Sequence, residues 1–339
     1  MIASRYHWKR SIEKTLPVVQ EFLRGRAPSF VYGGPVRELP IFTFHAVGGG
    51  FRDDLERLAR GGYRTVGAEE LTGYARGTWT PSDKDVALTF DDGLRSLADV
   101  AAPLLAEFGM RAVAFVVTEL VPDETRNQLV GWRELKLWVS RGVLEVGAHS
   151  AYHHHVPVAP HIIGFVTPKT DTDFAADVPV PRVSGSRLVR LGEPIFVGRP
   201  RYTALKAYRP DPAGIERVAV AVDREGPGFF ARPKWRRELK ELASVCGEYE
   251  SPSDVEDAIC GDMQTAVRRV RERCPNRAAS HLCFPWYARN ARADRLAGES
   301  GIEVTYGGIT VNRARSPRVL RRLPPDFMWR LPGPGRICL

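Results

Sequence analysis

The feature that most constrains the fold is the alternation of short apolar segments with helix-like segments between residues 39 and 149. The apolar segments are nearly continuous runs, which is typical of strands buried on both faces of a parallel sheet. The expected strands cover residues 39–47, 63–66, 86–90, 111–117 and 143–149, and two more follow at 279–285 and 302–306. This pattern predicts a parallel sheet covered by helices, which closes into a barrel if enough repeats are present.

Helices are expected between these strands because apolar residues recur there at helical spacing. Residues 97–108 carry one apolar stripe that ends before Gly109. Other expected helices cover residues 51–59, 68–74, 132–142, 211–222, 234–245, 252–272 and 291–299. The alternation is lost at about 157–212, a stretch rich in proline, valine and arginine that we interpret as an insertion with short strands.

These boundaries predict a basic amphipathic N-terminal arm at residues 1–38, one domain at 39–325 that contains the insertion, and a C-terminal tail at 326–339. Charged residues interrupt the apolar positions of the arm, so it lacks the continuous apolar core of a signal peptide. No run approaches the 18 or more apolar residues of a membrane span. We therefore expect a cytoplasmic protein.

The net charge of +9 comes with basic clusters at residues 182–201 and 313–322. No zinc finger, RNP-type or basic heptad pattern accompanies them, so nucleic-acid binding is not predicted, whereas peripheral contact with an anionic membrane stays open. We interpret the arginines after residue 313 as a solvated strand edge. Among the five cysteines there is no CxxC pair, which argues against a disulfide framework or a cysteine zinc site. Nothing in the sequence predicts an oligomeric state.

Polar residues gather directly after two of the expected strands. Asp91 and Asp92 follow residues 86–90, and His149 and His153 lie at the end of residues 143–149 and just beyond. Because the carboxyl ends of parallel strands open on one face, the two groups are expected to meet. One carboxylate and two imidazoles can bind a divalent metal and leave a position open for water. The second carboxylate can then serve as the general base.

With these motifs the chain resembles the polysaccharide deacetylases, the NodB-type family also called carbohydrate esterase family 4. The resemblance rests on TFDDG at residues 89–93 and HSAYH at 149–153, and FTFHAV and CFPW are further similar segments. It covers roughly residues 39–156 and 280–323. It implies a distorted (β/α) barrel that removes an N-linked acetyl group with a divalent metal, for which zinc is the expected ion.

The resemblance also implies roles for the individual residues. Asp92, His149 and His153 would bind the metal, and Asp91 would deprotonate the metal-bound water. That water would then attack the amide carbonyl of the substrate.

The third family motif implies the substrate contacts. Trp286, which follows Pro285, would donate its backbone N–H to the developing oxyanion. The expected sugar pocket includes Pro285, Trp286 and Tyr287. The motif departs from the family pattern at two positions: Cys283 stands where the family often has an arginine that orients the base, and Tyr287 stands where it usually has glycine.

The C-terminal Leu-x-His motif, which supplies the general acid in many members of the family, has no clear counterpart in this chain. Two other histidines are candidates for this role. His45 ends a strand near the predicted mouth of the barrel, and His281 precedes the third motif. We take His45 as the candidate general acid.

The sequence therefore predicts a metal-dependent hydrolase of a non-peptide C–N bond, a carbohydrate N-deacetylase acting on an N-acetylated sugar or sugar-containing molecule. Two alternatives stay open: hydrolysis of another C–N bond, as in a cyclic amide, and a degenerate deacetylase-like protein that binds a glycan. An iron oxygenase is disfavoured because no carboxylate lies two residues after His149. HExxH peptidase chemistry is excluded because Ser150 stands where glutamate is required.

Overall fold

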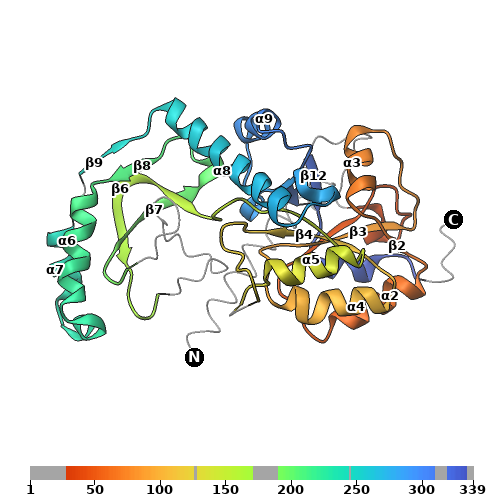
Figure 1. Ribbon diagram of the computed structural model, residues 1–339, viewed down its shortest axis with the longest axis horizontal. Coiled ribbons are helices and arrows are strands. Elements are labelled where there is room, and N and C mark those ends of the chain that lie inside the picture. Colours follow the sequence, from red (N-terminus) through yellow and green to blue (C-terminus); the bar gives the residue numbers. More distant parts are fainter. Residues whose placement is uncertain (1–27, 126–127, 171–189, 244–245, 310–318, 334–339) are drawn as a thin grey trace. The chain divides into compact units, whose positions relative to one another are not determined.

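The computed structural model describes residues 28–125, 128–170, 190–243, 246–309 and 319–333 (Figure 1). The chain divides into two compact units, which are described separately. The first consists of Met1–Ser150, Thr265–Tyr287 and Gly301–Leu339, and the second of Ala151–Gln264 and Ala288–Ser300. The predicted arm at 1–38 and tail at 326–339 lie partly outside the described residues.

The first unit is built on parallel strands in the order β1–β3–β4–β5–β10–β11–β12, and β2 pairs with β3. Their bounds are β1 Ile41–Phe44, β2 Arg64–Thr65, β3 Asp85–Phe90, β4 Ala112–Val116, β5 Leu144–Ala148, β10 His281–Cys283, β11 Val304–Ile309 and β12 Val319–Arg322. Leu323, next to β12, pairs with Phe42 of β1. The Thr43 N–H donates to the Leu323 carbonyl at 2.9 Å, which closes the ring. The predicted distorted (β/α) barrel is confirmed.

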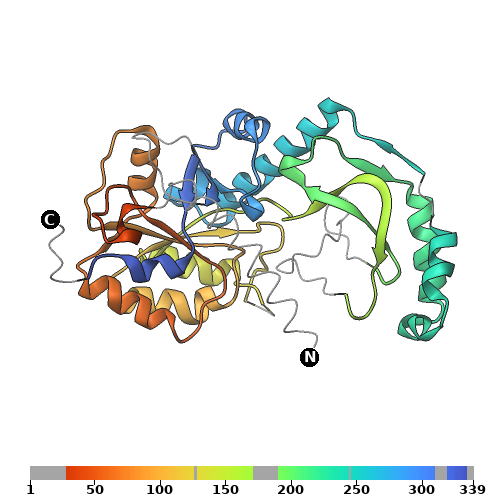
Figure 2. The same cartoon turned by 180° about the vertical axis from the view of Figure 1, so that it is seen from behind.

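Helices cover the outside of this ring. Figures 1 and 2 show α2, α4 and α5 together along one side of the strands, and α3 along another. Their bounds are α2 Phe51–Arg60, α3 Ala68–Arg76, α4 Ala102–Glu107 and α5 Trp132–Ser140. The residues of β3 and β4 are all buried, as their largely apolar sequences predict. One buried cluster joins side chains of β1, β3, β4, β11 and β12 to those of α3, so the same apolar runs hold barrel and helix together.

The helix expected at residues 97–108 is interrupted. Residues Leu97–Ala101 form a π-helical turn, in which the Ala102 N–H donates to the Leu97 carbonyl five residues earlier, and α4 begins only after it. The cause is Pro103, which has no N–H to donate to the preceding turn. The apolar stripe predicted the position of the helix correctly but not its geometry.

The second unit contains the predicted insertion at about 157–212. Strands β6 His155–Phe165 and β7 Pro194–Pro200 are antiparallel, as are β8 Tyr208–Pro210 and β9 Gly247–Tyr249. Its helices are α6 Pro212–Asp223, α7 Trp235–Leu242 and α9 Ala291–Glu299, and the long helix α8 Pro252–Arg273 begins here and continues into the first unit. Phe229 lies in an apolar core with Val218 and Leu239. No helix in the described part of the chain is long and apolar enough to cross a membrane.

Candidate active site

The loops that leave the carboxyl ends of β3, β5 and β10 share an unusual backbone conformation. Left-handed φ angles occur at Asp92 (72°), Ser150 (67°), His153 (47°), Trp286 (53°) and Tyr287 (55°). Each such residue costs about 1–2 kcal/mol relative to a right-handed conformation. Among the described residues, all non-glycine positions of this kind fall in these three loops. Strain of this kind collects where function requires it, which identifies this end of the strands as the candidate site.

The backbone separates the two acids of the doublet. Asp91 continues β3, because its N–H donates to the Phe44 carbonyl of β1 at 2.9 Å. The chain then turns through Asp92 and Gly93, which both have positive φ. A Cβ atom on Gly93 would lie 3.0 Å from Cγ1 of Val116, so the turn requires glycine here. Two acids that are adjacent in sequence therefore have different surroundings.

Asp91 is buried in an ion pair with Arg322 of β12. The Arg322 Nη1 donates to Oδ1 at 2.6 Å and Nη2 donates to Oδ2 at 2.7 Å, while Nη1 also lies 3.2 Å from the Thr89 hydroxyl. Burial alone would raise the pKa of Asp91, but the charges of Arg322 and His149 outweigh it and hold that pKa well below its usual range. Asp91 is therefore a carboxylate at neutral pH.

The expectation of a solvated edge is wrong for Arg322, which is only 1% exposed. Its guanidinium lies 5.2 Å from the centre of the Tyr287 ring, and its Nη2 lies 2.9 Å from the Cys283 Sγ. Arg322 points inward because side chains alternate along a strand, and Leu320, two residues earlier, is fully buried. The charge is stable in this position because the Asp91 carboxylate compensates it.

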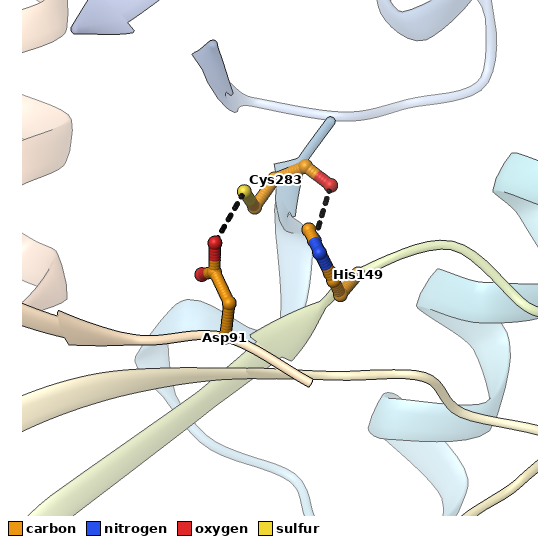
Figure 3. A group of neighbouring side chains, drawn as sticks. All are labelled: Asp91, His149 and Cys283. Atoms are coloured by element: carbon orange, nitrogen blue, oxygen red, sulfur yellow. Dashed lines mark hydrogen bonds between the residues drawn. The ribbon is translucent and has the colours of Figure 1, made fainter. Parts of the chain in front are cut away.

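His149 follows β5 and joins the other strand ends (Figure 3). Its Nδ1 lies 3.0 Å from the Cys283 carbonyl oxygen, and its Nε2 lies 3.4 Å from Oδ1 of Asp92. Since a carbonyl can only accept, Nδ1 carries the proton in this contact and Nε2 keeps its lone pair. Burial lowers the pKa of His149 to about 4, so the ring is neutral at pH 7, as a metal ligand must be.

Asp91, His149 and Cys283 also bring three donor atoms within 4.8 Å of one another (Figure 3). This group does not fit a cation, because the Arg322 guanidinium already binds both oxygens of Asp91 and contacts the Cys283 sulfur. Burial also raises the pKa of the Cys283 thiol well above its usual value, so the sulfur stays protonated. The donor pair that fits a metal is Asp92 with the Nε2 of His149.

His153 belongs to the second unit. It is buried and lies four residues after His149, which limits the separation of their Cα atoms to about 14 Å. The segment between the two histidines is therefore short enough for both to bind one ion, and the role of His153 as the third ligand stays a prediction.

The two histidines considered as general acids have different surroundings. His45 directly follows β1 and is half-buried, and it lies near enough that its charge lowers the pKa values of Asp91 and His149. His281 is fully buried, with Nε2 2.9 Å from the Thr72 hydroxyl and Nδ1 3.0 Å from the Tyr306 hydroxyl. Burial lowers the pKa of His281 to about 3. His281 is thus a neutral part of the barrel interior.

The third motif forms a short turn after β10. Pro285 is buried, and Trp286 and Tyr287 both take left-handed conformations. The Tyr287 ring covers the Arg322 guanidinium, and burial raises the pKa of its phenol to about 12. Cys283 has a small side chain at the point where Arg322 reaches Asp91. The two departures from the family motif thus both contact the same arginine.

Comparisons with known proteins bear on the family and on the fold. Residues 79–177 match the family model described as polysaccharide deacetylase. The predicted resemblance to this family is confirmed over these residues. YxkH of Bacillus subtilis (strain 168), a protein named for the same family, is 30% identical over 89 residues, which are 24% of this chain and 32% of YxkH. The matched segment thus spans about a third of that relative.

Solved deacetylase structures share the fold of this chain. A de-N-acetylase from Aggregatibacter actinomycetemcomitans superposes with a TM-score of 0.55 over 84% of this chain and 94% of its own. IcaB from Ammonifex degensii superposes with a TM-score of 0.54 over 87% of this chain and 95% of its own. The BpsB deacetylase domain from Bordetella bronchiseptica superposes with a TM-score of 0.54 over 85% of this chain and 96% of its own. All three are 16% identical to this chain, so the likeness concerns the fold.

Sequence reasoning missed Arg322, the residue of this candidate site that contacts Asp91 most closely. Its only local signal is the alternation of Leu320 and Arg322 on one face of a short strand, beside the oppositely directed Arg321. Neighbouring arginines obscure that signal, because a basic run is usually solvated.

Proposed function

We propose that this chain is a metal-dependent hydrolase that removes an N-acetyl group from a carbohydrate or sugar-containing substrate. The observation that carries the proposal is the juxtaposition of two buried groups at the strand ends. Asp91 is held ionised by Arg322, and beside it Asp92 and the neutral His149 offer oxygen and nitrogen donors. The match of residues 79–177 to the deacetylase family supports this reaction class.

Asp92, His149 and His153 are the proposed ligands of one divalent ion, for which Zn²⁺ is expected. The fixed tautomer and low pKa of His149 support its part in this set. When bound, the ion would polarise the acetyl carbonyl and lower the pKa of a nearby water.

Asp91 is the proposed general base, and it takes the proton of the attacking water. Arg322 is the proposed positioning residue: its two hydrogen bonds fix the plane of the carboxylate and keep it ionised. The same pair makes Asp91 a weaker base, because a carboxylate of low pKa holds a proton poorly. Arg322 therefore contributes orientation and charge rather than basicity.

The remaining roles concern the substrate. The backbone N–H of Trp286 is proposed to stabilise the oxyanion that forms as water attacks, which is consistent with the strained turn around it. His45 is proposed to protonate the leaving amine, which its closeness to Asp91 supports. Pro285, Trp286 and Tyr287 are proposed to line the sugar pocket.

Metal content and acetate release test the proposal together. Wild-type protein and Asp91→Asn would be reconstituted with Zn²⁺, assayed for bound metal and incubated with a panel of N-acetylated sugars. We expect about one bound ion in both proteins and acetate release by the wild type only. Metal without turnover on any sugar would favour another C–N bond or a glycan-binding role. A folded wild type that binds no metal would exclude the proposed mechanism.

A further inference from the structure

A buried carboxylate on α8 lies against the loop formed by residues 151–154. Oδ1 of Asp262 accepts the Ala151 N–H at 3.1 Å and also the hydroxyl of Tyr202. The Tyr152 amide and the Arg201 charge further stabilise the ionised form of this carboxylate. Asp262 is 7% exposed and lies 111 residues from Ala151 along the chain, so the contact is a product of the tertiary fold.

The other end of this loop has its own anchor. The Arg201 N–H donates to the His154 carbonyl at 3.2 Å, and the Arg201 guanidinium is paired with Glu250 at 2.9 Å. Tyr202 follows Arg201 directly, so its hydroxyl bond to Asp262 links the anchor at His154 to the anchor at Ala151.

His153 lies between these two anchors in a left-handed conformation, with φ of 47°. A strained non-glycine residue keeps such a conformation only if the surrounding structure restrains it from more than one side. The hydrogen bonds at Ala151 and His154 restrain the residues two before and one after His153. The direction in which the imidazole leaves the backbone therefore depends on them.

We infer that Asp262 and Tyr202 are positioning residues that hold the loop on both sides of His153, and so set the geometry of this metal ligand. The inference rests on the function proposed above. Neither residue is a ligand or a catalytic group: Asp262 acts on the backbone, and Tyr202 acts through Asp262. Partners that orient metal ligands typically change metal affinity or activity by about 10–100-fold when they are removed.

Three variants separate the loop restraint from other effects. Asp262→Leu removes the acceptor at similar volume, Asp262→Asn keeps an oxygen that can accept both bonds, and Tyr202→Phe removes one hydroxyl. Tyr249→Phe is the matched control, because Tyr249 lies in the same unit and is 46% exposed. The readouts are Zn²⁺ affinity by competition with a chromophoric chelator and the visible spectrum of the Co²⁺-loaded protein, with circular dichroism to confirm folding.

We expect Asp262→Leu to weaken Zn²⁺ binding by roughly 10-fold or more and to alter the Co²⁺ spectrum. Tyr202→Phe should produce a smaller change in the same direction, whereas Asp262→Asn and Tyr249→Phe should bind Zn²⁺ as the wild type does. If Asp262→Leu does not fold, the Zn²⁺ affinity and Co²⁺ spectrum of Tyr202→Phe test the inference. Wild-type affinity and spectrum in the folded variants would overturn the inference and leave the proposed function intact. A wild type without metal affinity would instead overturn the proposed function.

Discussion

Arg322 and Asp91, which are 231 residues apart in the sequence, form a two-point ion pair inside the barrel. The pair connects β12 to the end of β3, while β1 lies between these strands in the closed ring. A buried pair of this kind adds little net stability over apolar residues, but removal of one partner leaves an uncompensated charge. The pair is therefore a sensitive probe of the site.

Replacement of either Arg322 or Asp91 alone by a neutral residue should destabilise the protein strongly. We expect Arg322→Met and Asp91→Asn each to lower the free energy of unfolding by about 3–5 kcal/mol, because each leaves one buried charge without its partner. The double variant should lose clearly less than the sum of the single losses. Urea unfolding of the four proteins measures this coupling, with Arg330→Met as an exposed control. Additive losses would show that the two side chains do not form the ion pair in solution.

The metal content of variants should distinguish the proposed metal ligands from residues that do not bind the ion. We expect Asp92→Asn and His149→Gln to bind far less Zn²⁺ than the wild type, because each removes one of the few donors of the site. His161→Gln is the control, since His161 is exposed on β6. Elemental analysis after dialysis against a weak chelator measures the loss. Full retention of Zn²⁺ by His149→Gln would remove this residue from the ligand set.

Much of the fold could be predicted from local pattern. Strands β3 and β4 are buried on both faces, and apart from Asp85 and Thr89 of β3 their residues are apolar, so their sequences alone identify them. The predicted meeting of Asp91 with His149 follows from the same rule, since each lies at the carboxyl end of a parallel strand. Figure 3 shows both side chains directed toward Cys283 of β10.

Arg322 and Asp262 could not be predicted in the same way, because their roles depend on partners more than 100 residues away. Nothing in the neighbouring sequence of a helix residue such as Asp262 distinguishes a buried acceptor from a solvated acid. The π-helical turn before α4 does not follow from the apolar stripe, because the spacing of apolar side chains carries no information on the missing N–H of Pro103.

The two candidate general acids should respond differently to substitution. We expect His45→Gln to lower kcat for acetate release by about 10²–10⁴-fold, the range usual for loss of a general acid. His281→Gln should lower stability but not kcat, because both ring nitrogens of His281 are bonded to Thr72 and Tyr306 within the barrel. Steady-state kinetics on the best N-acetylated sugar measures both. A larger loss of kcat in His281→Gln than in His45→Gln would reverse the assignment.

The buried Asp262 should make stability depend on pH in a defined direction. Burial raises its pKa to about 6, against the opposing effects of the Tyr202 hydroxyl, the amides of Ala151 and Tyr152, and the Arg201 charge. A carboxyl whose pKa is higher in the folded than in the unfolded state favours folding when it is protonated, and that contribution is lost as pH rises through about 6. The loss amounts to roughly 2 kcal/mol between pH 4 and pH 7. Asp262→Asn stays neutral and should not show it.

Urea unfolding of wild type and Asp262→Asn across this pH range measures the difference directly. Because other titrating groups are common to both proteins, their contributions cancel in the comparison. We expect the wild type to lose stability relative to Asp262→Asn as pH rises from 4 to 7, with the steepest change at about pH 5, between the unfolded and folded pKa values, and little change above about pH 7. A difference that does not vary with pH would mean that Asp262 titrates at its ordinary pKa. Its carboxylate would then be exposed to solvent rather than enclosed by Ala151 and Tyr202.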